Sequence, residues 1–489
     1  MSNLINSINQ VISENNLPFK WSKKINNELE NIKSFSKLKR KDLTKKPFIT
    51  IDGEDAKDFD DAVFCIKKSS NFILYVAIAD VAEVVASDSE LDKEALKRGT
   101  SIYFPNKVIP MLPEEISNDI CSLVPNKNRN VLVCEISFDL EGNINSYEFF
   151  EAVINSHKRL TYNEVEDEDN LNINPNIKNS ITAIKDLTKK LIKNRINRCA
   201  LEINTSEPGI KINKNGDIDE IFLPKRLFAH LMIEECMIAA NICAAKFIKK
   251  HLGFGVYRTH EEPEKLKIEN LKKFFLLQGL TSKSFLKPLE LINSFIKHIN
   301  KDEDNKIMNI LILQSLKRAQ YSTKEVGHFG LQLKEYSHFT SPIRRYPDLI
   351  THRLIKKILK KDKKSLSKEK LEETLADLSA LEKRAEHVSR QVTQQLICHY
   401  LKKFIGDEFS SMIVGIAEFG LFCEIEKYYI SGLLHVSDLS HDRYYFDKEA
   451  NMLRGRRTGR TFRIGQKVNV QLANVIPDER KIILIEKLR

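Results

Sequence analysis

Four aspartates within ten residues constrain this chain more than any other feature: Asp52, Asp58, Asp60 and Asp61 lie in FITIDGEDAKDFDDAVFCI. Both flanks of the cluster read as β-strand, so the carboxylates are held close together, where mutual repulsion and desolvation destabilise them. A divalent metal relieves that cost, and oxygen-only ligands suit Mg²⁺ or Mn²⁺. The alternative is a solvated acidic turn. The spacing is not that of a calcium loop, which needs Gly at its sixth position and Glu at its twelfth.

Length, charge and cysteine content limit the kinds of protein that this chain can be. The chain has 489 residues, too many for one ordinary core, so we expect two or three domains. Its 78 Lys and Arg exceed its 67 Asp and Glu, and the net charge of +11 favours polyanionic partners such as nucleic acid. The eight cysteines form no Cys-x-x-Cys pair, which is typical of reduced thiols. With no signal peptide and no apolar run of membrane-spanning length, we expect a soluble, cytoplasmic protein.

Periodicity and composition divide the chain into three parts. Residues 1–46 are polar and lysine-rich, with helical patterning from Trp21 to Ile32 and then a basic linker. Residues 47–404 begin with strand-like alternation and continue mostly as helix. Residues 405–489 contain short strand-like runs separated by glycine-containing turns, typical of a small barrel. The predicted fold class is therefore α+β, a mixed α/β domain followed by a small all-β barrel.

Two helices can be placed from their end signals. Ser89 is a suitable cap for a helix that runs to Arg98, and Gly99 is a suitable stop. A long, largely buried helix is predicted from Pro224 to His251, because its middle is rich in Ala, Met and Ile.

A second motif lies far from the aspartates: HFGLQLKEYSHFTSPIRRYPDLITHR, residues 328–353. Together the two motifs resemble the catalytic domain of the ribonuclease R and ribonuclease II (RNB) exoribonuclease family. RGTSIYFPNKVIPMLPEEISNDICSLVP, EECMIAANICAAK and GFGVYRTHEEP resemble the same family and occur in its order, so the similarity covers about residues 46–400. The motifs are more similar to the ribonuclease R branch than to the ribonuclease II branch.

The resemblance implies roles for individual residues. Asp52, Asp58, Asp60 and Asp61 match the family's four acidic positions, which hold two Mg²⁺ ions, with Mn²⁺ as a substitute; Asp60 is the one most directly tied to cleavage. Arg344 matches the arginine that reaches the scissile phosphate. Further implied contacts with RNA are Tyr103 on the terminal base, Tyr257 at the ribose, Glu386 near the 3′ end, and Arg345. For Arg345 the alternative is a salt bridge to a local acid, and for each tyrosine a place in the core. Lys334 departs from the acidic ribose contact of the ribonuclease II branch.

The C-terminal part resembles an S1-like OB fold. Such barrels stack single-stranded bases on exposed aromatic residues beside a basic groove. The resemblance places Phe419, Phe422 and His435 on the binding face, with the core as the alternative for one or two of them. A further segment, predicted to be a loop, carries Arg454, Arg456, Arg457 and Arg460, for which we expect RNA contact.

The leading interpretation is a monomeric 3′-to-5′ hydrolytic exoribonuclease that degrades single-stranded RNA to nucleoside 5′-monophosphates in RNA turnover. About 45 residues precede the first expected catalytic strand, too few for the cold-shock-type barrels usual in the family. This is either a naturally short form or a start downstream of the true one. The alternative function is a catalytically silent RNA-binding protein, against which the intact aspartates and Arg344 argue.

Overall fold

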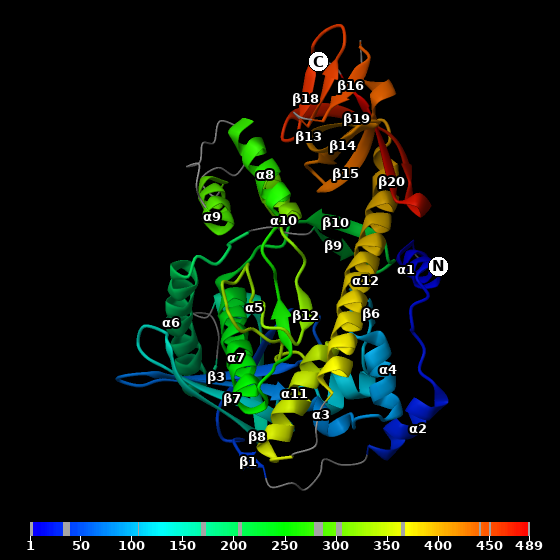
Figure 1. Ribbon diagram of the computed structural model, residues 1–489. Coiled ribbons are helices and arrows are strands. Elements are labelled where there is room, and N and C mark those ends of the chain that lie inside the picture. Colours follow the sequence, from blue (N-terminus) through cyan, green and yellow to red (C-terminus); the bar gives the residue numbers. More distant parts are fainter. Residues whose placement is uncertain are drawn as a thin grey trace.

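A mixed α/β domain and a small β-barrel are joined by one long helix, α12 (Lys368–Leu401), as Figure 1 shows. This computed structural model describes residues 3–32, 40–105, 107–167, 173–203, 208–277, 287–299, 306–362, 367–439, 442–448 and 451–487. Both parts have the helix and strand content predicted for them, so the α+β fold class is confirmed. Of the predicted basic linker KLKRKDLTKK, residues 37–39 lie outside the described residues, and the rest contains the short strand β1 (Lys41–Asp42).

The main sheet of the α/β domain has the strand order β1-β8-β2-β3-β4-β7, and an additional pairing between β8 and β7 closes that order into a ring. The long strand β8 makes this possible, because residues 144–155 pair with β7 and residues 156–161 pair with β2. Its pairing with β2 is parallel, whereas β2, β3, β4 and β7 follow one another in antiparallel pairs. The bounds are β1 (Lys41–Asp42), β2 (Phe48–Asp52), β3 (Asp61–Lys67), β4 (Phe72–Ala79), β7 (Asn128–Phe138) and β8 (Ile144–Thr161).

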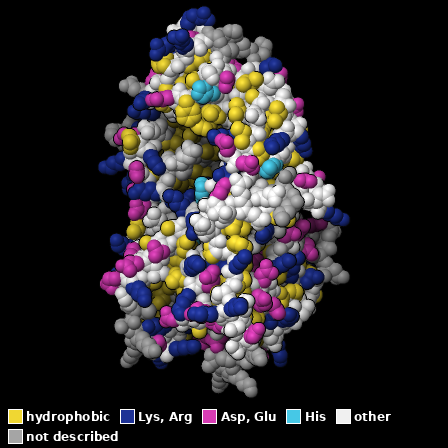
Figure 2. Space-filling model, turned by 90° about the vertical axis from the view of Figure 1, so that its right-hand side faces the viewer, with side chains coloured by type: hydrophobic (Ala, Val, Ile, Leu, Met, Phe, Trp, Pro, Cys, Tyr) yellow, Lys and Arg dark blue, Asp and Glu magenta, His cyan; other side chains and the backbone are white. Residues whose placement is uncertain are grey.

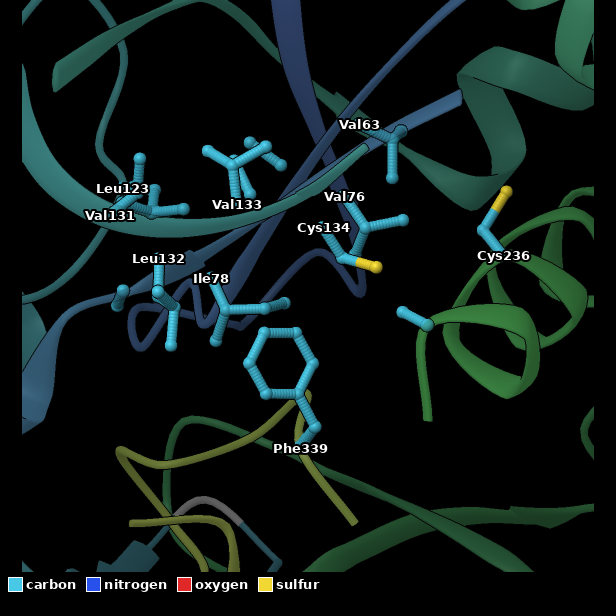
Figure 3. Packing of buried hydrophobic residues seen from close by; sticks show 14 of the residues in the cluster. Val63, Val76, Ile78, Leu123, Val131, Leu132, Val133, Cys134, Cys236 and Phe339 are labelled. Atoms are coloured by element: carbon cyan, nitrogen blue, oxygen red, sulfur yellow. The ribbon is translucent and has the colours of Figure 1, made fainter. Parts of the chain in front are cut away.

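The core of this domain lies between the sheet and α7 (Phe228–Leu252). In Figure 3, Val76, Ile78 and Cys134 project from the strands toward Cys236 of α7 and toward Phe339. All are buried, and a fully buried side chain of this size stabilises the fold by roughly 1.5–3 kcal/mol. The core therefore fixes Phe339, which lies five residues before Arg344 in the second motif.

Local signals account for most helix ends. The Ser89 side chain accepts a hydrogen bond from the Asp92 amide at the start of α4 (Glu90–Arg98), and Gly99 ends that helix with φ +71°, as predicted. The predicted helix near Trp21 is α2 (Lys23–Asn31), and α7 matches the prediction from Pro224. Helix α1 (Asn3–Glu14), which packs on α12, was not predicted.

The remaining elements of the domain are shorter or peripheral. They are α3 (Val81–Val84), β5 (Ile102–Phe104), β6 (Lys107–Ile109), η1 (Glu115–Ile120), α5 (Tyr162–Glu166), α6 (Pro175–Asn197), β9 (Gly209–Ile212), β10 (Ile218–Phe222), β11 (Tyr257–Thr259), α8 (Lys265–Leu277), α9 (Pro288–Ile299), α10 (Lys306–Ser315), β12 (Gln320–Ser322), α11 (Tyr346–Leu359) and η4 (Lys402–Phe404). In the described part of the chain, no helix is long and apolar enough to span a bilayer.

The C-terminal part is a closed barrel of order β13-β14-β15-β20-β19, as the S1-like prediction requires. Its strands are β13 (Glu408–Ala417), β14 (Gly420–Ile425), β15 (Ile430–His435), β19 (Lys467–Ile476) and β20 (Lys481–Glu486), with turns η5 (Val436–Asp438) and η6 (Pro477–Glu479). The arginine-rich segment predicted as a loop contains a three-stranded sheet of β16 (Tyr444–Asp447), β17 (Met452–Gly455) and β18 (Thr461–Arg463), whereas Arg456, Arg457 and Arg460 lie between β17 and β18 and outside both strands, as predicted. Cross-strand pairing orders this insertion, and Arg454 lies within β17.

Candidate active site

The aspartate cluster (Asp52, Asp58, Asp60 and Asp61) lies at one edge of the ring-closed sheet. Asp52 is the last residue of β2, and Asp61 is the first residue of the antiparallel β3. The loop between them therefore returns the chain to the edge that it left, carrying Asp58 and Asp60. Strand β8 ends at the same edge, because it runs parallel to β2 and pairs Thr161 with Asp52.

Burial makes Asp52, Asp60 and Asp61 hard to ionise. Asp60 is 3% exposed, and burial, with some repulsion from Asp58, raises its pKa to about 8 against the attraction of Arg344. Burial also raises the pKa of Asp52 to about 6, Asp58 adding to the rise while Arg344 opposes it. For Asp61 burial, Asp52 and Asp60 together hold the pKa well above its usual range. The structure thus brings all four aspartates together as mutually repelling neighbours.

Two donors from the second motif hold Asp60 in place. The amide of Ile343 donates to Asp60 Oδ1 at 2.8 Å, and Nε of Arg344 donates to Oδ2 at 3.2 Å. The Arg344 Nη2 atom also donates to Ser341 Oγ at 2.9 Å. The Arg344 side chain remains 43% exposed, so its guanidinium is accessible as well as anchored.

Tyr103 lies directly beside the cluster. It is on β5, in a hairpin with β6, and its hydroxyl donates to Asp58 Oδ2 at 2.7 Å. Its side chain is exposed and, with Asp58, lines a cavity of about 890 Å³. An exposed ring beside the carboxylates has the setting that base stacking requires. On α12, Ser389 bonds the Tyr103 carbonyl, and Glu386 forms an exposed ion pair with Arg318 at 2.6 Å.

Two predicted RNA contacts, Tyr257 and Arg345, have side chains that are buried or paired within the protein. Tyr257 is only 3% exposed, and the charges around its hydroxyl are those of Glu325, Lys249 and Glu335 rather than the aspartates. The structure thus places the Tyr257 hydroxyl nearer to these charges than to the aspartates, and its ribose contact stays a prediction. Arg345 donates to Asp348 at 2.7 Å, which is the local salt bridge weighed as its alternative.

The sequence interpretation missed Tyr162. This residue follows Thr161 at the end of β8, and the charges of Asp52 and Asp61 add to a pKa already raised by burial. Its ring stacks on His230 with centroids 4.0 Å apart. The signal that could have found it is the parallel pairing of β8 with β2, which brings both strand ends to one edge, but that pairing is not readable from a single sequence.

The donor set fits a divalent metal. One observation tests this directly: Asp52 Oδ2 is buried and has no hydrogen-bond partner. A buried carboxylate oxygen without a partner is costly, and a cation satisfies it. All four side chains offer hard oxygen ligands. Mg²⁺ is usually held by one or two carboxylates together with water and substrate phosphate.

A tighter acidic group lies elsewhere. Within the described ranges, Asp80, Glu83 and Glu151 are the group of three whose ligand atoms lie within 4.8 Å of one another. Lys356 Nζ contacts all three carboxylates at 2.7–2.9 Å, and Arg40 lies 2.7 Å from Asp80. These two cations already compensate the carboxylates, so we do not assign a metal to this group.

The barrel presents an exposed aromatic face. Phe419 is 49% exposed, Phe422 and His435 are also exposed, and the two phenylalanine rings meet edge to face at 6.0 Å. The core alternative is therefore excluded for all three. Arg454, Arg456 and Arg457 are exposed, whereas Arg460 is paired with the buried Glu486 carboxylate at 2.5 Å. Figure 2 shows a hollow below the barrel end of the molecule with Lys and Arg side chains beside it.

Comparisons with known families match both parts of the chain. The RNB domain matches residues 40–361, and the S1 RNA binding domain matches residues 402–485. Ribonuclease R of Vibrio parahaemolyticus is 37% identical over 96% of this chain, which spans 59% of that protein. Ribonuclease R of Buchnera aphidicola from Schizaphis graminum is 40% identical over 96% of the chain, which spans 67% of it. The chain thus spans about three fifths to two thirds of these relatives.

Solved structures give the same result. The RNase R of Mycoplasma genitalium in complex with ribose-methylated single-stranded RNA is 31% identical, with a TM-score of 0.93 over 99% of this chain and 78% of that one. Yeast Ssd1, described as a pseudonuclease, shares the fold with a TM-score of 0.71 over 92% of this chain and 58% of that one, at 18% identity. The fold alone therefore does not decide between a nuclease and a silent relative.

Proposed function

Because the chain belongs to the RNB family, we propose that it is a 3′-to-5′ exoribonuclease that hydrolyses single-stranded RNA to nucleoside 5′-monophosphates. The observation that carries this proposal is the aspartate cluster, in which a buried, partnerless Asp52 oxygen lies beside Asp60 and its anchored Arg344. We further propose that the protein acts as a monomer in RNA turnover.

The second candidate is a catalytically silent RNA-binding protein, which the fold shared with a pseudonuclease favours. The energetics of the cluster oppose it. Four repelling carboxyls, two of them with pKa values raised to about 6 and about 8, destabilise the fold unless a ligand compensates them. A protein that only binds RNA has no need of carboxyls that destabilise its fold, so we favour the enzyme.

Mg²⁺ is the proposed cofactor, two ions held by Asp52, Asp58, Asp60 and Asp61, with Mn²⁺ able to replace it. When bound, such ions activate a water, neutralise charge on the phosphate and stabilise the leaving 3′ oxygen. The protein's own contribution is to keep the carboxylates at one sheet edge. Asp60 is held rigidly by the Ile343 amide, so its position does not depend on the ions.

Arg344 supplies the charge that faces the phosphate. A guanidinium stays ionised and binds phosphate oxygens in a two-pronged geometry, which suits charge that builds up in the transition state. Its Nε atom is occupied by Asp60 and one Nη2 bond goes to Ser341, while the exposed remainder of the group is free to meet substrate.

The RNA strand is bound by stacking and by charge. We propose that Tyr103 stacks on the 3′-terminal base and that Glu386 contributes near the 3′ end, both steadied by α12. The barrel face of Phe419, Phe422 and His435 then stacks bases farther from the end, and the exposed arginines of the β16–β18 sheet contact phosphates.

Labelled RNA tests the function directly. RNA carrying a 5′ label, incubated with protein and Mg²⁺, should shorten stepwise from its 3′ end, nucleoside 5′-monophosphates should accumulate, and EDTA should stop both. Intact RNA would support the silent protein, and internal fragments at early times would indicate an endonuclease. A second RNA blocked at its 3′ end should resist degradation, which separates exonuclease from contaminating activities.

A further inference from the structure

The turn from Ser341 to Arg345 both connects the core to α11 and positions two hydrogen-bond donors at Asp60. It leads from the buried Phe339 into α11, and on the way it delivers the Ile343 amide and the Arg344 guanidinium to Asp60. Neither donor is part of a helix or strand, so nothing in regular secondary structure fixes their positions. The turn must be held by other contacts.

Asp348 provides one of these contacts. It is fully buried in the first turn of α11, and its Oδ1 atom accepts from the Ser341 amide at 2.8 Å and from Arg345 Nη2 at 2.7 Å. Oδ1 is therefore both hydrogen-bonded and paired with a cation, whereas the buried Oδ2 has no hydrogen-bond partner. The carboxylate thereby joins the two ends of the turn.

Ser341, which Asp348 holds in place, in turn orients the Arg344 side chain. Its Oγ accepts from Arg344 Nη2 at 2.9 Å, and its carbonyl accepts from the Arg345 amide at 2.9 Å. The series Asp348–Ser341–Arg344–Asp60 is therefore continuous in hydrogen bonds. Of these four residues, Arg344 has the exposed side chain, and the other three are buried.

The other side of the turn is held by the segment that leads to Tyr103. Thr100 Oγ1 and the Ser101 amide both donate to the Arg344 carbonyl, at 2.9 and 3.0 Å. The main chain of Arg344 is thus fixed from one side, and Asp348 fixes the side-chain partners from the other. Removing Asp348 should leave the backbone anchored while the guanidinium loses its direction.

We propose that Asp348 is a positioning residue that aims Arg344 at the scissile phosphate. This rests on the proposed nuclease function. Asp348 touches neither substrate nor metal; it keeps Ser341 where its hydroxyl can orient the guanidinium. The consequence is that its loss lowers the rate of the chemical step through Arg344 and not through metal binding.

The variants are Asp348→Asn, which keeps the acceptor oxygen but removes the charge that holds Arg345, and Asp348→Ala, which removes both. On a short oligonucleotide we expect kcat to fall about 10-fold and about 10²-fold, with KM changed by less than about 3-fold. Asp92→Asn is the matched control, because Asp92 is also buried and also bonds α11, through Tyr346 and Arg353, but does not contact the turn. It should lower thermal stability comparably and leave kcat unchanged.

A double-mutant cycle separates positioning from general destabilisation. In an Arg344→Lys background, Asp348→Asn should cost less than about 3-fold further in kcat, because the side chain on which it acts is gone. The same cycle is measured as affinity for a phosphorothioate-linked pentanucleotide, where about 2-fold coupling is expected, within the small change allowed for KM. Equal losses in both backgrounds, in either measurement, would overturn the proposal. If the wild-type protein bound this RNA without cleaving natural RNA, the proposed function would fail while the binding cycle still decided the role of Asp348.

Discussion

The aspartate cluster and the exposed face of the barrel both carry charge, but they carry it under opposite conditions. In the cluster, the carboxyls are buried or partly buried and repel one another, and the pKa values of Asp52 and Asp60 are raised to about 6 and about 8. In the C-terminal part, the side chains of Arg454 and Arg456 are exposed to solvent. Charge in the first setting destabilises the fold until a ligand arrives, whereas charge in the second is screened by water and salt. The buried charges of the aspartate cluster therefore point to a bound ligand, whereas the exposed arginines do not by themselves indicate one.

The largest effect should come from Asp60→Asn, which preserves the shape of the side chain but removes its charge. Turnover should fall by on the order of 10³-fold or more, because both the metal ligand and the partner of Arg344 are lost. RNA affinity, measured by filter retention of a labelled oligonucleotide, should change little. Asp55→Asn is the matched control, since Asp55 lies in the same loop but is exposed. Equal losses from both substitutions would mean that burial does not distinguish these acids.

Arg344→Lys should be the next most damaging change. It keeps a positive charge but loses the planar group that bonds Asp60 and Ser341 together, so kcat on a short oligonucleotide should fall about 10²-fold. Arg353→Lys provides the control, because Arg353 lies on α11 and bonds Asp92 instead of the cluster. A kcat for Arg344→Lys close to wild type would show that the site needs charge alone.

Stability without metal should depend on pH in a defined direction. The raised pKa values mean that the folded protein holds protons that the unfolded chain releases. Stability in EDTA should therefore fall as the pH rises from about 4, the ordinary aspartate value, through about 6 for Asp52 and about 8 for Asp60. Across this range the loss of stability should lower Tm by on the order of a few °C, which calorimetry resolves.

Two comparisons sharpen that measurement. Mg²⁺ should restore Tm at high pH by binding the folded state, and Asp52→Asn should flatten the pH profile in EDTA while reducing the response to Mg²⁺. A wild-type Tm in EDTA that rose between pH 5 and 8 would contradict the picture of a self-repelling cluster.

The smallest effect is expected on the barrel. Arg454→Ala with Arg456→Ala should raise KM on long RNA about 3- to 10-fold and flatten the salt dependence of binding, leaving kcat on short oligonucleotides unchanged. Arg460→Ala should mainly lower stability, because Arg460 is paired with Glu486. An unchanged salt slope in the double variant would mean that this face meets something other than RNA.

What the sequence could predict follows from the range of each interaction. The aspartates lie within ten residues, so their spacing alone indicated a shared centre, and Ser89 and Gly99 mark both ends of α4 by local chemistry. Tyr162 could not be found, because its place depends on β8 continuing past β7 to run parallel to β2. Tyr257 lay in a matching motif, yet its side chain turns into the core. Arg454 lies in a strand because β17 pairs with β16, and this pairing cannot be predicted from the residues around Arg454 alone.

Helix α12 has a consequence for the whole molecule. Its 34 residues contain neither proline nor glycine, and at 1.5 Å per residue they extend about 51 Å without a built-in hinge. The helix touches Tyr103 through Ser389 near its middle and the barrel near its end. About 18 Å of rigid rod therefore separates those two points, twelve residues at the helical rise. With the proposed RNA contacts at Tyr103 and the barrel, this fixed separation implies a minimum length of RNA that can contact both at once. Strands shorter than that length should lose the barrel contacts in a single step.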